Sequence, residues 1–125
     1  ADAHCDIPCG IYDPGDAIQA AQTVIRMTEL IEAMGVPTTV QDHNSFNRYV
    51  AVKEEHATKA KNDIVIIWTD YFKPEHLAAN PELHTKVWEA CKLGSQVKQH
   101  VDMDAAVAFK AALEEIGAAF AETKK

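Results

Sequence analysis

The sequence has little of three features that would each suggest a class of protein: long apolar runs, positive charge and cysteine. The longest apolar runs, such as Ile64–Trp68, have five residues, far short of the roughly 20 needed to span a bilayer. Twelve lysine and arginine residues against 19 aspartate and glutamate residues give a net charge of −7. This balance argues against nucleic acid or an anionic membrane surface as the main partner. The first residues also lack the basic region and apolar stretch of a secretory signal.

Cysteine occurs only three times in 125 residues, which excludes a disulfide-stabilised scaffold and leaves at least one thiol unpaired within the chain. We therefore expect a reducing, cytoplasmic location. The chain also lacks internal repeats, low-complexity segments and linkers, while 47% of its residues are hydrophobic. Residues 1–125 are accordingly predicted to form a single domain with a true core.

Apolar residues at alternating spacings of three and four predict helices through most of the chain. In the first helix, Asp13 is a candidate N-cap, Pro14 takes the first helical position, and Gly35 and Pro37 end the helix. Its apolar face consists of Ala17, Ala20, Val24, Met27, Ile31 and Met34.

The next segment is predicted as a helix from Asn44 or Ser45 to about Asn62. The apolar stretch that follows is rich in β-branched residues, and Lys73 before Pro74 disfavours helical angles. We expect it to be an extended connector packed across the helices, with Ile67 and Phe72 exposed. Both are compatible with an interface between copies of the chain.

Two further helices complete the predicted fold. The third is entered through Pro81, and the fourth begins near Asp102 or Asp104. Their core positions are Leu83, Val87, Ala90, Gly94 and Val97 in the third, and Ala106, Phe109, Leu113, Ile116 and Phe120 in the fourth. Four amphipathic helices with short connections predict an all-α, antiparallel four-helix bundle over residues 13–125.

The segment before the first helix concentrates groups that bind metals. Pro8 and Gly10 favour a turn that can bring the thiolates of Cys5 and Cys9 and the imidazole of His4 to one point. Thiolates and imidazole select soft or borderline metals. Cys91 lies at a core-facing helix position, so the cluster lacks the fourth side chain of a structural zinc site. Main-chain nitrogens could complete a square-planar site of the kind that nickel or copper favours.

At the level of motifs, the segment His4–Pro14 closely resembles the nickel hook of the nickel-dependent superoxide dismutase family. The stretches Trp68–Pro74 and Pro81–His84 are also similar to that family. The resemblance implies a hexamer of four-helix bundles with one nickel ion per subunit, which converts superoxide to oxygen and hydrogen peroxide. It also implies a metal-binding hook over residues 4–12.

The same resemblance implies the ligand set. The thiolates of Cys5 and Cys9, the amide nitrogen of Cys5 and the α-amine of His4 would form a square plane around nickel. The imidazole of His4 would be the axial ligand of the oxidised state. An α-amine at His4 requires that Ala1, Asp2 and Ala3 be removed, so the resemblance also implies a processing protease. The chain that still carries them is expected to bind nickel poorly and to be nearly inactive.

Four further residues are implied to support the reaction. Tyr12 would stand over the open face of the metal, Asp6 and Tyr71 would lie in its hydrogen-bonded surroundings, and Lys73 would attract superoxide. Without the motif, the two tyrosines are ordinary half-buried aromatics and Lys73 is an ordinary surface lysine.

The match weakens where the family orients its axial histidine with a glutamate and an arginine. Ala20 and His56 stand at those two places. Gln19 is adjacent to Ala20, but one step along a helix turns the side chain by about 100°. The departure suggests a different hydrogen-bonded support around His4. It also keeps a second hypothesis open, in which the chain is a non-catalytic metal-binding or thiol-switch protein that forms a reversible Cys5–Cys9 disulfide.

Overall fold

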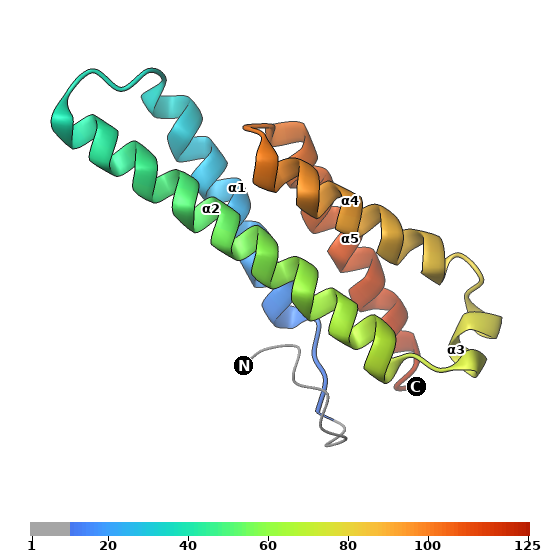
Figure 1. Ribbon diagram of the computed structural model, residues 1–125. Coiled ribbons are helices and arrows are strands. Elements are labelled where there is room, and N and C mark those ends of the chain that lie inside the picture. The colour runs from blue at the N-terminus through green and yellow to red at the C-terminus, as the bar shows by residue number, and fades with distance from the viewer. Residues whose placement is uncertain (1–10) are drawn as a thin grey trace.

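The computed structural model describes residues 11–125, which form an all-α bundle (Figure 1). The fold class predicted from the periodicity is confirmed. The helices are α1 (Gly15–Met34), α2 (Val40–Ile66), the π-helix η1 (Ile67–Tyr71), α3 (Pro74–Ala79), α4 (Leu83–Gln99) and α5 (Met103–Glu122).

The four long helices pack as a ring in which α1 and α4 each contact both α2 and α5. The start of α1, the end of α2 and the end of α5 lie at the same end of the bundle (Figure 1). The core between the helices is built largely from alanine and a few larger side chains, because small residues let helices approach closely. The fully buried larger apolar residues are Val24, Ile64, Ile67, Leu83, Val97, Phe109, Leu113 and Ile116.

Helix α1 begins one residue later than predicted, at Gly15. Pro14, and not Asp13, is therefore the N-cap residue. Asp13 still satisfies one free backbone donor of the first turn, because its Oδ1 accepts a hydrogen bond from the backbone nitrogen of Gly15 at 2.8 Å. Gly35 ends the helix with a φ of 67°, a backbone conformation that residues other than glycine rarely adopt. The predicted end of α1 is therefore confirmed.

The start of α2 was predicted four or five residues too late. The helix begins at Val40, and the Thr39 hydroxyl accepts a hydrogen bond from the backbone nitrogen of Asp42 at 2.9 Å. The first turn is mostly exposed, as Gln41 and His43 show. An exposed turn carries no apolar periodicity, so the capping threonine is the only sequence signal for this start.

The extended connector predicted after Asn62 was wrong. The chain stays in α2 as far as Ile66 and then forms η1. Ile64 and Ile67 are both 0% exposed, and they continue the three- and four-residue spacing of Ala57 and Ala60. Burial along this stripe outweighs the weak preference of β-branched residues for strands. Ile67 is thus a core residue and not an exposed one.

The rest of the chain follows the prediction with one addition, the short helix α3. Lys73 is extended, with φ −121° and ψ 166°, and Pro74 opens α3, as expected for a residue before proline and for proline at a helix start. Helix α4 begins at Leu83. The start of α5 is confirmed, because Asp102 Oδ1 accepts a hydrogen bond from the backbone nitrogen of Ala105 at 3.0 Å.

A buried lysine links α2 to the end of α4. Lys53 is 2% exposed, and its Nζ donates hydrogen bonds to the carbonyl oxygens of Val97 at 2.8 Å, His100 at 2.8 Å and Lys98 at 3.4 Å. These carbonyls lack partners within their own helix, and the positive charge also suits the negative end of the helix dipole. Burial lowers the pKa of Lys53, and the nearby carboxylate of Glu54 opposes this effect.

Candidate functional site

Tyr12 and Tyr71 lie together at the end of the bundle where α1 begins. Tyr12 precedes α1, and Tyr71 is the last residue of η1. Their ring centroids are 5.8 Å apart and their planes are tilted by 58°. Both rings pack, with Phe72, against the buried pair Ile67 and Phe120. Two residues that the sequence analysis placed in one site, 59 positions apart, are therefore neighbours in the fold.

The π-helix explains how the end of α2 presents these aromatic rings. Its hydrogen bond from the nitrogen of Phe72 to the carbonyl oxygen of Ile67, at 3.2 Å, spans five residues instead of four. The wider turn lets Ile67 point into the core while Tyr71 and Phe72 both reach Phe120, at centroid distances of 4.5 and 6.4 Å. Single π-turns are rare and are frequently found at functional sites.

A histidine stacks on the Tyr71 ring. The two rings are nearly parallel, with an interplanar angle of 9° and centroids 5.7 Å apart. His76 is held by α3, and its Nδ1 accepts a hydrogen bond from the backbone nitrogen of Lys73 at 3.0 Å. In the neutral imidazole this bond leaves the proton on Nε2. His76 had no sequence signal that placed it at this site, because it shows no metal-ligand spacing with the cysteines.

Two lysines lie near the aromatic cluster at this end of the molecule. Lys124 Nζ lies 5.0 Å from the Tyr71 ring centroid and 5.3 Å from that of Phe120. Lys73 is exposed, next to α3. Lys124 was also missed from the sequence, where it is simply part of a polar C-terminal segment.

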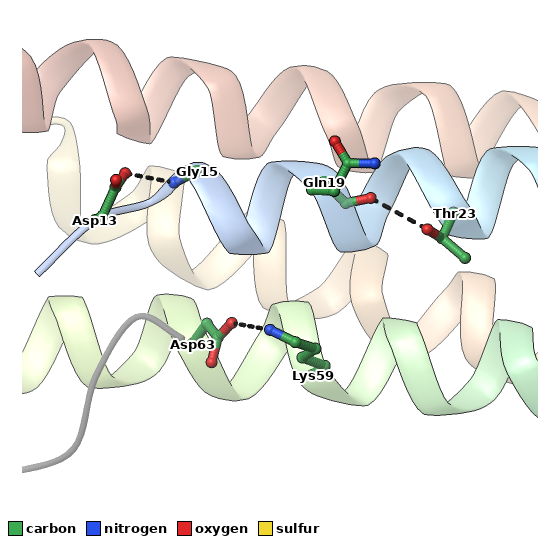
Figure 2. Close-up of polar contacts among 6 residues, drawn as sticks. All are labelled: Asp13, Gly15, Gln19, Thr23, Lys59 and Asp63. Carbon is green, nitrogen blue, oxygen red and sulfur yellow. Dashed lines mark hydrogen bonds and ion pairs between the residues drawn. The ribbon is translucent and has the colours of Figure 1, made fainter. Parts of the chain in front are cut away.

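Ala20 and His56, the two positions at which this chain departs from the family pattern, differ in their capacity to form hydrogen bonds. Ala20 is 3% exposed and carries no polar side-chain group. His56 is half-buried, and its Nδ1 donates to the Val52 carbonyl oxygen of its own helix at 2.8 Å. Its Nε2 is then an acceptor in the neutral ring. Gln19 is exposed, and in Figure 2 its side chain points away from α2.

A buried carboxylate lies farther along α2. Asp63 is 5% exposed, and its Oδ2 forms an ion pair with Lys59 Nζ at 3.1 Å (Figure 2). Among the described residues, Asp63 is the only buried acidic side chain. The apolar pattern of this stretch hid it from the sequence analysis.

The predicted metal ligands His4, Cys5 and Cys9, and the supporting residue Asp6, lie outside the described residues. Within residues 11–125, no three histidine, cysteine, aspartate or glutamate side chains are placed to hold a metal ion. Cys91 is half-buried, and burial raises the pKa of its thiol although Lys61 opposes the shift. A protonated thiol is a poor metal ligand. The donor set that suits nickel is therefore the hook's pair of thiols with an adjacent imidazole.

Comparison with known proteins agrees with the hook motif. The family described as nickel-containing superoxide dismutase matches residues 1–124. A superoxide dismutase [Ni] of Streptomyces seoulensis is 39% identical over 124 residues, which is 98% of this chain and 89% of the relative. The corresponding protein of Streptomyces coelicolor is 35% identical over 123 residues, with the same two shares covered.

Solved structures show the same fold. A native nickel superoxide dismutase structure has a TM-score of 0.86 and 34% identity, and the match covers 98% of this chain and all of that one. A structure whose nickel ligation corresponds to the oxidised state has a TM-score of 0.86 and 37% identity, with 97% of this chain and 98% of that chain covered. None of the helices described here is both long and apolar enough to cross a membrane.

Proposed function

Because the chain belongs to the nickel-containing superoxide dismutase family, it is a nickel-dependent superoxide dismutase, and we propose that His4, Cys5 and Cys9 hold its nickel ion. The observation that carries the proposal is the hook sequence within a family match that spans residues 1–124. The bound metal supplies one-electron redox chemistry, which turns superoxide into oxygen in one half-reaction and hydrogen peroxide in the other. Two thiolates make that cycling accessible to nickel.

The tyrosines and lysines at this end of the bundle are proposed to control how superoxide approaches the metal and how protons are supplied. Tyr12 and Tyr71, packed together beside the start of α1, are proposed to limit access to the metal and to supply hydrogen-bonding hydroxyls. Asp6 is proposed to complete this network. Lys73 is proposed to attract superoxide, and Lys124 beside the Tyr71 ring supports the same electrostatic role.

The proposal includes the release of His4 from the three residues before it. As a free amine, the α-nitrogen of His4 is a good neutral donor, whereas in a peptide bond with Ala3 its lone pair is delocalised and it can bind a metal only after losing its proton. We expect a chain that begins at His4 to bind one nickel ion and to consume superoxide. The chain that keeps residues 1–3 should do neither well.

The test measures nickel content and superoxide loss for both chains after the same nickel treatment, with Cys5→Ser in the shorter chain as a control for adventitious metal. Equal nickel content and equal turnover in the two chains would contradict the α-amine as a ligand. No turnover in either chain would show that Ala20 and His56 mark a loss of activity, and it would favour the thiol-switch hypothesis.

Assembly into a hexamer is proposed from the family resemblance. Several large apolar side chains are exposed in the single chain and are available to an interface; they are Ile11, Val36, Val40, Val65, Leu77, Trp88, Val101 and Val107. Mass measurement in solution, by light scattering, tests the assembly. A reducing, cytoplasmic compartment is also proposed, since Cys5 and Cys9 bind nickel only as thiolates and not as a disulfide.

A further inference from the structure

A chain of two short hydrogen bonds ties Tyr71 to the end of α5. The Tyr71 hydroxyl oxygen is 2.6 Å from Oγ1 of Thr123, and that Oγ1 is 2.6 Å from the carbonyl oxygen of Phe120. A carbonyl only accepts, so the single hydroxyl proton of Thr123 is donated to Phe120. Thr123 must then accept the proton of Tyr71. The Tyr71 hydroxyl therefore points its proton toward the end of α5.

The rings around Tyr71 fix its plane, and Thr123 fixes its hydroxyl. His76 stacks on the ring at 5.7 Å, and Phe120 packs against it at 4.5 Å. Neither contact determines where the phenolic proton lies. Thr123 does, because it sits in the turn that closes α5, where its backbone nitrogen also donates to the Phe120 carbonyl at 3.1 Å. The acceptor is thus held by main-chain as well as side-chain bonds.

From this geometry we propose that Thr123 is a positioning residue for superoxide dismutation, acting through Tyr71. With its proton committed to Thr123, the Tyr71 oxygen offers lone pairs to the rest of the site and acts there as a hydrogen-bond acceptor. In this role the Tyr71 oxygen accepts a hydrogen bond from a donor near Tyr12. It does not donate its own proton to superoxide. The inference rests on the proposed role of Tyr71 in the reaction, so that role is tested alongside it.

Three substitutions isolate the Thr123 hydroxyl. Thr123→Val removes it and nearly preserves the shape of the side chain, whereas Thr123→Ser restores it. Thr23→Val is the matched control, because Thr23 is also half-buried and its Oγ1 donates to a carbonyl of its own helix, that of Gln19, at 3.3 Å (Figure 2). Thr23 lies on α1, where its hydroxyl serves only its own helix.

The first measurement needs no nickel. Tyrosine rings are labelled with ¹³C, and the Tyr71 signal is assigned by its loss in Tyr71→Phe. We expect the signal of the Tyr71 carbon bonded to oxygen to move in Thr123→Val and to stay near its original position in Thr123→Ser and Thr23→Val. A Tyr71 signal that is unchanged in Thr123→Val would overturn the proposed hydrogen bond.

The second measurement is the turnover of superoxide by the nickel-loaded protein that begins at His4. Thr123→Val should lose about fivefold in turnover, the size expected for one hydrogen bond of ordinary strength, and Thr123→Ser should recover most of it. Full activity in Thr123→Val beside a clear loss in Tyr71→Phe would overturn the role of Thr123 alone. Full activity in Tyr71→Phe would instead refute the proposed role of Tyr71, and the positioning role would fall with it.

Discussion

Lys53 in the middle of α2 and Tyr71 at the end of η1 each contact the C-terminal end of another helix, but with different consequences. Lys53 donates to three carbonyls at the end of α4 from a position that is 2% exposed. Tyr71, at the end of η1, reaches the last turn of α5 through Thr123 and stays half-buried. The buried contact satisfies backbone groups and holds the fold together. The half-buried contact fixes the direction of a hydroxyl for which we propose a role in the reaction.

Truncating Ile67, the buried first residue of η1, should have the largest effect on stability. Ile67→Ala is expected to lower the free energy of unfolding by about 2–5 kcal/mol, because Ile67 is 0% exposed and its loss leaves a cavity against Phe120. Val65→Ala, two residues earlier at a position 38% exposed, should cost less than about 1 kcal/mol. Urea denaturation of both variants checks this. Equal losses would contradict the helical continuation beyond Asn62.

The next largest effect should distinguish the Lys53 contact from the Tyr71 contact. Lys53→Met keeps much of the apolar stem but leaves the carbonyls of Val97 and His100 without their donor, so we expect a loss of about 1–3 kcal/mol in stability. Turnover of the nickel-loaded protein should be unchanged. Tyr71→Phe should behave in the opposite way, with lower turnover and nearly unchanged stability. A Lys53→Met variant that unfolds as easily as the parent protein, or one with impaired turnover at full folding, would remove the distinction.

The sequence predicts the helix ends better than it predicts the course of the chain from Ile64 to Tyr71, for a physical reason. Local signals such as Asp13, Gly35 and Asp102 act on their own helix, so capping rules located them well. The helical course of Ile64–Tyr71 depends on the burial of Ile64 and Ile67 between helices, which competes with local propensity and cannot be read from one segment. The hook motif was recognisable because its proposed ligands lie within a few residues of each other.

The same reasoning explains what was missed at the site. Thr123 and Lys124 meet Tyr71 only because the end of α5 packs against η1. His76 is close to Tyr71 in sequence, but only the turn into α3 stacks its ring on the tyrosine. Nothing in the local sequence marks Thr123 as the partner of a tyrosine 52 positions away. Lys53 escaped notice for a similar reason, since a lysine on a helix is usually exposed and its buried acceptors belong to another helix.

The smallest expected effect is a change in how stability depends on pH. Burial lowers the pKa of Lys53 in the folded protein, so in the alkaline range below the usual lysine value of 10.5 the unfolded chain binds more protons than the folded one. Stability from this group therefore rises as the pH increases through that window, and it is lowest where Lys53 is charged in both states.

The measurement compares the parent protein with Lys53→Met by urea denaturation at neutral pH and at two alkaline values. The stability advantage of the parent should grow with pH, whereas Lys53→Ala and Lys53→Met should show the same pH dependence as each other. An advantage that shrinks toward alkaline pH would mean that the charged ammonium, with all three of its donors, stabilises the end of α4 by more than its burial costs. In that case the contact at Lys53 would be an electrostatic cap, and its contrast with the neutral contact at Tyr71 would become sharper.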